Sequence, residues 1–296
     1  MNEEVPLLSV VVASTHASGH VERCLDVLRS QVQGRRVEII LAGAFTPDQE
    51  SKFDDICFIP FPEATPGPVL WGAGIARARG EQIAVTDTLT LFDAGWVDAA
   101  LCACTPERPI AGGAVEPLPV QSLVNWAAYF CDYGQFMRPL QGGTSRELPG
   151  TNVTFKRTLL EHASAYTQPS FWKTYWCRAL AADGVPLTSV PSMVAFHAKE
   201  YRLGSLLLRR YRHGRCFGGM RNEQLSVGRR VAYLAGSPLL PVLFLLRMTR
   251  TFLPKRRFRR QFFASLPFSV LALASWSIGE AFGYLAGPGD SCQFVY

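Results

Sequence analysis

Four short apolar runs, separated by segments of helical character, constrain the fold of this 296-residue chain more than any other feature. The runs are LLSVVVA at 7–13, VEIILAGA at 37–44, ICFIPF at 56–61 and EQIAVT at 81–86. Short β-branched runs of this kind are typical of strands buried on both faces, whereas VERCLDVLRSQV at 21–32 has helical periodicity. The alternation predicts an α/β fold with a mostly parallel sheet flanked by helices.

Ligands of such sheets bind beyond the carboxyl ends of the strands. The residues to consider are therefore three groups that follow predicted strands: Ser14–His16, Gly43–Phe45 and Asp87–Leu89. The third group contains a single acid, Asp87, followed by Thr88 and Leu89. If the fold is right, we expect Ala13, Gly43 and Asp87 to converge at one edge of the sheet, within roughly 15 Å of one another.

Four segments resemble the family-2 glycosyltransferases, in the order in which that family has them. They are LLSVVVASTHASGHVERCLDVLRSQ at 7–31, GPVLWGAGIARARGEQIAVTDTLTLFDAGWV at 67–97, LPGTNVTFKRTLLE at 148–161 and WCRALAADGVPLTSVPSMVAFH at 176–197. The resemblance extends from Leu7 to about His197. It implies a GT-A fold, an inverting hexosyl transfer from a nucleotide-sugar, and usually a bound Mn²⁺ or Mg²⁺.

The departures from the family pattern fall on its chemical positions. The acid that binds base and ribose in the family aligns with Gly43, and an Arg-Asn pair aligns with Trp71 and Gly72. The metal-binding D-x-D aligns with Asp87, Thr88 and Leu89, so its second acid is a leucine. The Glu-Asp pair that includes the general base aligns with Trp172 and Lys173.

The resemblance implies the following site. Asp87 and Lys173 occupy catalytic positions, and the donor-binding positions are Ala13, Ser14, Thr15, Gly43, Asp87, Asn152 and His197. A hard cation prefers carboxylate oxygens, so Asp87, even aided by His197, would bind Mn²⁺ or Mg²⁺ weakly or not at all. A protonated lysine is a poor base but neutralises phosphate. Diphosphate charge would then be met by Lys173, Arg157 or a nearby arginine.

Several alternatives stay open at this point. The alignment could slip locally and leave other acids in place, namely Asp93, Glu116, Asp132 or Glu147. Asp87 could instead cap the turn from Thr88 to Asp93. His197 could be a surface histidine, and Asn152 could only hold its turn. Trp172 and Trp176 are four residues apart, which favours packing over a sugar-stacking platform.

The last third of the chain has a different composition. Residues 201–230 combine apolar residues at helical spacing with many arginines, which predicts an amphipathic helix on anionic lipid rather than a nucleic-acid site. Residues 231–296 hold two apolar segments around the basic run PKRRFRR. The second segment is long enough to cross a bilayer, and the first is short and contains Pro238 and Pro241, which predicts a re-entrant or interfacial segment. Glu280, within the second segment, is either interfacial or a functional intramembrane acid.

Three predicted regions follow: a GT-A glycosyltransferase-like domain over 1–200, basic interfacial helices over 201–230 and membrane-associated helices over 231–296. The eight cysteines form no C-x-x-C pair, which predicts reduced thiols in a cytoplasmic protein. The acidic N-terminal run MNEEVPLL, followed at once by a predicted strand, predicts that there is no signal peptide. We expect the protein at the cytoplasmic face of a bacterial inner membrane. Its substrates would be a nucleotide-sugar and a lipid-linked or envelope glycan acceptor. The alternative is a non-catalytic binding or scaffold protein of the same fold.

Overall fold

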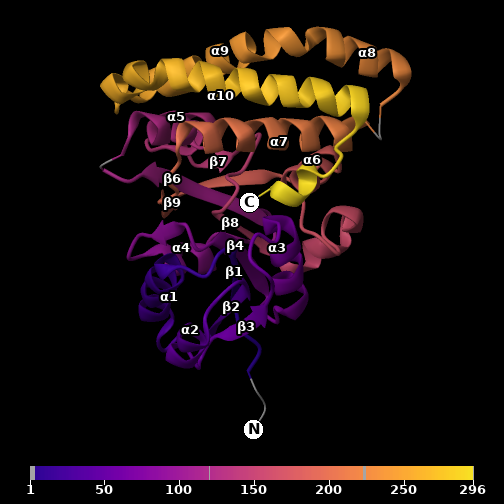
Figure 1. Ribbon diagram of the computed structural model, residues 1–296. Helices are drawn as coiled ribbons and strands as arrows, with labels where there is room; N and C mark the ends of the chain where they lie inside the picture. The colour runs from indigo at the N-terminus through magenta and orange to yellow at the C-terminus, as the bar shows by residue number, and fades with distance from the viewer. Residues whose placement is uncertain (1–3, 120, 223–224, 296) are drawn as a thin grey trace. The chain divides into compact units, whose positions relative to one another are not determined.

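The computed structural model describes residues 4–119, 121–222 and 225–295 (Figure 1). The chain forms two compact units. Unit 1 comprises Met1–Glu116 and Phe136–Ala198, and unit 2 comprises Pro117–Gln135 and Lys199–Val295. The segment Pro117–Gln135 therefore leaves the chain's N-terminal part and packs with helices that follow it by about 70 residues or more.

The centre of unit 1 is a parallel sheet made from the four predicted runs. Its strands are β1 (Leu8–Ser14), β2 (Val37–Gly43), β3 (Cys57–Pro60) and β4 (Gln82–Asp87), and β1 lies between β2 and β4. The connecting helices are α1 (Gly19–Val32), α2 (Pro47–Lys52) and α3 (Gly67–Arg77). The predicted α/β fold with a parallel central sheet is confirmed.

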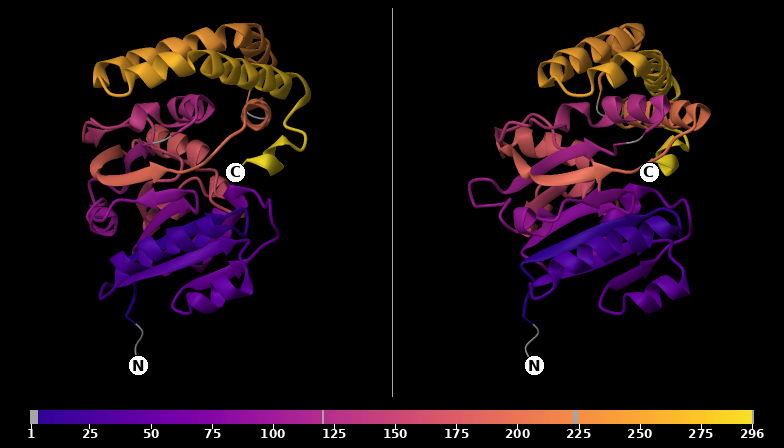
Figure 2. Two further views of the ribbon diagram at one scale, coloured as in Figure 1. Left: turned by 60° about the vertical axis from the view of Figure 1, so that its left-hand side comes forward. Right: turned by 90° about the vertical axis from the view of Figure 1, so that its left-hand side faces the viewer.

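Antiparallel strands extend this sheet beyond β4. The complete order is β3-β2-β1-β4-β8-β6-β9-β5, with β7 paired to β9. The added strands are β5 (Thr90–Phe92), β6 (Ile110–Pro117), β7 (Gly143–Thr144), β8 (Val153–Lys156) and β9 (Leu187–His197). Two further helices, α4 (Trp96–Leu101) and α6 (Lys173–Ala182), complete unit 1, whose sheet and flanking helices can be followed in Figure 2.

The sheet is buried on both faces because alternate side chains of each central strand enter different cores. Val10 and Val12 of β1 pack in the core that includes Leu25 of α1 and Trp96 of α4. Val11, between them, packs in the core that includes residues of α3 and α6. This two-sided burial explains why the strands are apolar without alternation, as the sequence predicted.

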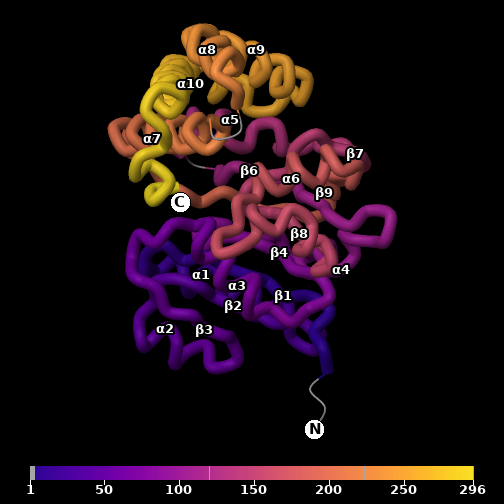
Figure 3. Tube along the Cα trace, turned by 90° about the vertical axis from the view of Figure 1, so that its right-hand side faces the viewer, coloured from indigo at the N-terminus to yellow at the C-terminus, as the bar shows by residue number. Residues whose placement is uncertain are grey.

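The described part of unit 2 consists mainly of helices (Figure 3). Its helices are α5 (Leu123–Asp132), α7 (Leu203–Asn222), α8 (Val227–Gly236), α9 (Leu240–Phe252) and α10 (Arg259–Ala286). A short 3₁₀ turn, Ser237–Leu239, joins α8 to α9 at the predicted proline-rich interruption. Among the described residues, two helical runs are long and apolar enough to cross a membrane, Val227–Lys255 and Arg259–Ala286.

Two sequence-based expectations about unit 2 need correction. The cysteines are not all reduced, because Cys216 of α7 forms a disulfide with Cys292 near the C-terminus, 76 residues away. Only helix packing brings these residues together, and their spacing in the sequence carries no such signal. The arginines of α7 were expected on lipid phosphate, but Arg209 and Arg210 both pair with Asp132 of α5.

Candidate functional site

The carboxyl ends of three parallel strands meet as the sequence predicted. In the register of the sheet, Ser14 lies opposite Gly43 and Ala13 lies opposite Asp87. Paired residues on neighbouring strands are separated by only about 5 Å, far less than the roughly 15 Å that would have overturned the prediction. Ala13, Ser14, Gly43 and Asp87 therefore form one continuous edge.

The backbone of this edge is fixed by the residues that precede helix α1. The Ser14 hydroxyl is fully buried and donates to the carbonyl of Ala44, 2.8 Å away. The carbonyl of Thr15 accepts a hydrogen bond from the backbone of Ala64 at 2.8 Å. These bonds tie the loops after β1, β2 and β3 into one rim, and donor contacts by Ser14 and Thr15 stay a prediction.

Gly43 can carry no side chain without a rearrangement of the rim. Its φ angle is +143°, and a Cβ atom added there would lie 1.9 Å from the carbonyl oxygen of Ser14. The family's acid at this position is therefore not simply replaced by a smaller residue. At this position β1 and β2 approach too closely for any L side chain.

The Asp87 carboxylate caps the turn that follows β4. Its Oδ1 atom accepts hydrogen bonds from the backbone N–H of Leu89 at 3.1 Å and from the hydroxyl of Thr90 at 2.8 Å. The Thr90 hydroxyl also lies 3.2 Å from that of Thr151. The turn-capping alternative is thus observed, and it commits one oxygen of the Asp87 carboxylate.

Strand pairing brings His197 to the same place. Thr90 of β5 lies opposite His197 of β9, so Asp87, Thr90 and His197 gather around one turn. The side chain of His197 is buried, so the alternative of a surface histidine is wrong. Neither Thr90 nor Thr151 was singled out from the sequence, although a threonine three residues after a capping aspartate is a recognisable signal.

The groups around Asp87 do not fit Mn²⁺ or Mg²⁺. They provide one carboxylate with an oxygen already committed, two threonine hydroxyls and one histidine, whereas such cations prefer several carboxylate or water oxygens. Leu89 occupies the position of the family's second acid and offers no ligand. Within the described part of the chain, no group of three or more His, Cys, Asp or Glu side chains could hold a metal ion.

Asn152 belongs to the framework behind the edge. It is fully buried, and its amide nitrogen donates to the carbonyls of Ala114 and Met193, both at 2.9 Å. Its Oδ1 atom accepts from the indole of Trp96 at 2.8 Å. Two segments that resemble the family separately are therefore joined by this bond, and the predicted donor contact of Asn152 stays untested.

Lys173 begins helix α6 and has an internal partner. Its ammonium donates to the carbonyl of Leu148 at 2.5 Å, and its side chain is only partly exposed. Burial lowers the pKa of Lys173, and the nearby Cys177 and Glu147 oppose that shift. The sequence predicts a Lys173 side chain that is protonated at neutral pH. Because burial lowers its pKa, the neutral amine forms at a lower pH than for an exposed lysine.

Arg157 does not lie at the carboxyl ends of the parallel strands. Its guanidinium donates to the carbonyl of Gly80 at 2.9 Å and also to that of Ala78, where α3 leads into β4. This is the amino end of β4, one strand length or roughly 20 Å from Asp87. The expectation that Arg157 supplies charge to a donor diphosphate is therefore wrong. The antiparallel strand β8, which the sequence did not predict, places Arg157 at this end of β4.

A local shift in the alignment would have placed other acids at the site. Two of them, Glu116 and Asp132, have arginine partners in the structure. Glu116 is buried and accepts hydrogen bonds from the backbone and the guanidinium of Arg138. Asp132 belongs to unit 2 and pairs with arginines of α7. Asp93 is exposed after β5, and Glu147 lies near Lys173.

Two tryptophans, Trp176 and Trp71, contact other parts of unit 1. Trp176 is fully buried against Phe155 and Phe171, as the packing interpretation predicted. Trp71, which aligns with the family's arginine, donates from its indole to the carbonyl of Thr86 at 2.6 Å. It therefore braces the residue that precedes Asp87, a role that the sequence did not indicate.

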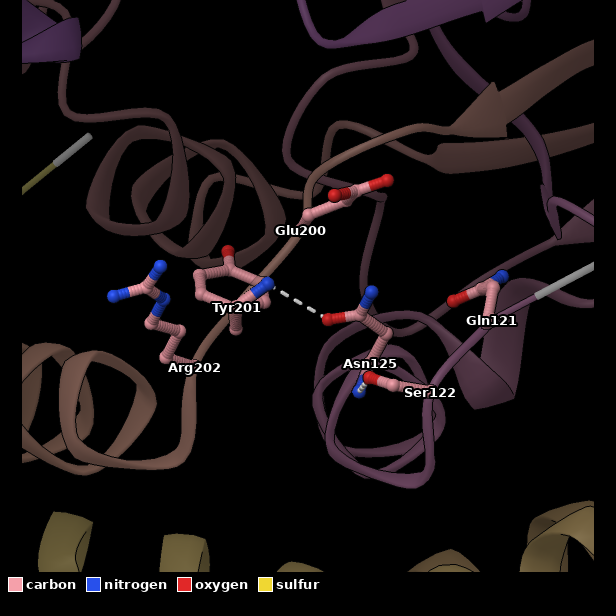
Figure 4. Close-up of a pocket in the computed structure, with 6 residues that line it drawn as sticks. All are labelled: Gln121, Ser122, Asn125, Glu200, Tyr201 and Arg202. Atoms are coloured by element: carbon pink, nitrogen blue, oxygen red, sulfur yellow. Dashed lines mark hydrogen bonds between the residues drawn. The ribbon is translucent and has the colours of Figure 1, made fainter.

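Unit 2 contains a pocket of about 470 Å³ that the sequence did not predict (Figure 4). Its lining residues are Gln121, Ser122, Asn125, Glu200, Tyr201 and Arg202. The amide oxygen of Asn125 accepts from the backbone N–H of Tyr201 at 2.7 Å, which fixes one wall. The lining side chains include both hydrogen-bond donors and acceptors.

No protein-family model and no curated protein matches the chain. Among solved structures, the chain is similar to the mannosyltransferase PcManGT from Pyrobaculum calidifontis in complex with GDP-Man and Mn²⁺. The similarity covers 96% of this chain and 88% of the neighbour, with a TM-score of 0.56 and 16% sequence identity. At this identity the similarity shows the fold, and the predicted GT-A class is confirmed.

Proposed function

We propose that the protein is a membrane-attached glycosyltransferase that transfers a hexose from a nucleotide-sugar, with inversion, to a lipid-linked or envelope glycan. The observation that supports this most is the edge formed by Ala13, Gly43 and Asp87 in a sheet of the GT-A class. Ligands of open α/β sheets bind at such edges. The neighbour was solved with GDP-Man, so GDP-mannose is the first donor to test.

In this proposal the strand ends bind the donor and Lys173 provides positive charge for its diphosphate. A protonated lysine replaces part of the charge that a cation would supply. The bond from Lys173 to the Leu148 carbonyl would have to be exchanged for a phosphate oxygen. Burial lowers the pKa of Lys173. As the pH rises through this lowered pKa, the ammonium loses its charge and donor affinity should weaken.

The proposed location is the cytoplasmic face of a bacterial inner membrane. Two helical runs of unit 2 are long and apolar enough to enter a bilayer, and the segment between them is basic. Basic loops are preferentially retained on the cytoplasmic side. This location places the enzyme beside lipid-linked acceptors and cytoplasmic nucleotide-sugars.

A second candidate is a non-catalytic protein of the same fold that binds a glycan or a partner. Two observations favour it: Asp87 is committed to a turn, and no acid can be accommodated at Gly43. Both positions carry chemistry in the family that the sequence resembles. A binding role would need the strand edge but not an acid or a base.

The two candidates can be separated by titrating UDP- and GDP-sugars into the full-length protein in detergent, with Mn²⁺ and with EDTA. We expect binding that is nearly independent of Mn²⁺, and slow sugar transfer or hydrolysis. Binding without turnover of any donor would support the non-catalytic candidate. Binding that requires Mn²⁺ would contradict the proposed site, because another acid would then have to complete it.

Lys173→Ala tests the residue that carries charge. Losing a charge-assisted contact should weaken donor binding by about 1–3 kcal/mol. Lys156→Ala is the matched control, because Lys156 lies opposite Gln82 at the amino end of β4. Equal effects of the two substitutions would show that Lys173 does not contact the donor.

A further inference from the structure

Helices α7 and α10 run parallel and in backbone contact within unit 2. The hydroxyl of Ser275 on α10 donates to the carbonyl of Leu207 on α7 at 2.7 Å. A Cβ atom added to Gly279 would lie 2.0 Å from the Tyr211 carbonyl, and one added to Gly214 would lie 2.1 Å from the Trp276 carbonyl. The contacts run from Leu207 to Arg221 on α7 and from Ser275 to Tyr284 on α10 with a nearly constant offset, so the two helices share one direction.

Buried polar contacts hold the pair together. Glu280 of α10 is almost fully buried and pairs with Arg221 of α7 at 3.2 Å. Its carboxylate also accepts hydrogen bonds from Trp276 at 2.9 Å and Tyr284 at 2.7 Å on the same helix. Separating α10 from α7 would leave this buried carboxylate without its cation, which is strongly unfavourable.

The pairing determines what α10 can do at a bilayer. An α10 that crossed the membrane would carry α7 across beside it, and α7 contains Arg209, Arg210, Arg212, Arg215 and Arg221. An arginine at the bilayer centre is strongly unfavourable because its charge loses hydration there. Asp132 of α5, paired with Arg209 and Arg210, would have to enter as well. A crossing orientation is therefore unfavourable for the pair, although α10 alone is long enough.

The opposite side of α10 is apolar and uncovered. In Figures 1 and 3, the helical run formed by α8 and α9 lies beside α10, and α7 lies below α10. Only 6% of the most apolar window of Val227–Lys255 is buried. Large apolar side chains are exposed along α8, α9 and α10, namely Val227, Val231, Leu239, Val242, Leu243, Leu246, Phe263, Val270, Leu271, Ile278, Phe282 and Leu285. We call this set the apolar face.

A basic turn adjoins the apolar face. The junction of α9 and α10 and the first residues of α10 contain Lys255, Arg256, Arg257, Arg259 and Arg260, and three of these, Arg256, Arg259 and Arg260, are exposed. Exposed apolar side chains on packed helices, next to exposed arginines, are complementary to a bilayer leaflet with anionic headgroups. A second protein copy would bury the apolar residues but would bring the same basic turn against itself or leave it without an anionic partner.

We propose that α8, α9 and α10 lie in the plane of an anionic leaflet, with the apolar face sunk into it and neither helical run crossing the bilayer. This orientation rests on the membrane attachment included in the proposed function and replaces the sequence-based expectation that the second segment crosses. The arginines of α7 then stay on the protein side of α10. Both ends of α10 stay on one side of the membrane.

Depth measurements along α10 test this orientation. Phe263, Leu271, Ile278 and Leu285 are exposed and spaced by seven or eight residues, so they share one helix face. Each is replaced in turn by cysteine, in full-length protein carrying Cys57→Ser, Cys102→Ser and Cys131→Ser, and labelled with an environment-sensitive fluorophore. Quenching is measured in phosphatidylcholine–phosphatidylglycerol vesicles with lipids spin-labelled near the headgroup or deep in the acyl chain.

We expect all four positions to report the same shallow depth. A profile that is shallow at Phe263 and Leu285 but deep at Leu271 and Ile278 would show a crossing helix and overturn the proposal. Labels that are shielded without lipid and insensitive to lipid quenchers would show that a second copy covers the apolar face. That result would overturn the proposal too. Nucleotide-sugar binding by the same labelled proteins reports on the proposed function separately.

The charge of the basic turn provides a second test. Arg256→Gln with Arg260→Gln should weaken binding to the anionic vesicles about fivefold for each charge removed. Binding to vesicles of phosphatidylcholine alone should change little. Arg77→Gln, an exposed substitution on α3 in unit 1, is the control and should leave vesicle binding unchanged. An equal loss with this control would show that the basic turn does not contact lipid.

Discussion

Two neighbouring parts of unit 1 differ in how far they keep the pattern of the family that the sequence resembles. The framework behind the sheet edge keeps it: Trp96 and Asn152 are buried and bonded to each other. The edge itself does not, since it has Gly43 and Leu89 where the family has acids. A fold depends on packing and internal hydrogen bonds, whereas acids at an edge serve a ligand. The framework can therefore persist when the chemistry of the edge has changed.

The largest expected effect tests the framework. Trp96→Ala removes a fully buried indole and should lower the free energy of unfolding by about 3–5 kcal/mol. Trp96→Phe keeps a ring but leaves the Asn152 amide oxygen without its donor, and should cost about 1–3 kcal/mol. Denaturant unfolding measures both. The control is Trp172→Ala, because Trp172 is partly exposed. An equally large loss of unfolding free energy in this variant would contradict the structural role given to Trp96.

The next effect tests whether the edge can accept the family's acid. Gly43→Asp should lower stability by about 1–3 kcal/mol, and Gly43→Ala should do the same, because any Cβ meets the Ser14 carbonyl. Gly19→Ala, where an added Cβ meets nothing within 4 Å, should change stability by less than about 0.5 kcal/mol. Thermal unfolding compares the three. A stable Gly43→Asp protein with improved Mn²⁺ binding would remove the distinction between edge and framework.

A smaller effect is expected when the second acid of the D-x-D pattern is restored. Leu89→Asp places a carboxylate two residues after Asp87, on a turn whose course the framework already fixes. Donor affinity should then rise about tenfold with Mn²⁺, or about 1.4 kcal/mol, whereas wild type should not respond. Leu89→Asn has nearly the same shape without the charge. A metal response in Leu89→Asn would indicate that the carboxylate is not the cause.

The smallest effect concerns the protonation of Lys173. Burial lowers its pKa in the folded protein below the ordinary value for a lysine, so folding disfavours the ammonium. Between the folded pKa and the unfolded value, the unfolded chain binds more protons, and stability therefore rises with pH. Lys173→Met should lack this rise, which amounts to a difference in Tm on the order of 2 °C between neutral pH and about pH 10. Parallel pH profiles for the two proteins would contradict the assignment.

The sequence predicted the parallel strands well because each is apolar enough to be buried on both faces. The apolar runs of β1, β2 and β4 mark their positions, and strand–helix alternation gives their direction. The antiparallel strands β8 and β9 were missed as sheet members, and this error misplaced Arg157. Antiparallel pairing joins residues far apart in the chain, such as Gln82 and Lys156, and no local pattern encodes it.

For the site, the sequence alone determined that Asp87 stands at a strand end and that Leu89 cannot be a ligand. These conclusions need only the strand pattern and the chemistry of the side chains. Only the tertiary structure decided that Asp87 is committed to the Thr90 turn, that Gly43 is closed by Ser14, and that the C-terminal half of α10 packs against α7. Each of these depends on the approach of segments distant in sequence. Hydropathy measures how apolar a segment is, and it cannot show which neighbour the segment packs against.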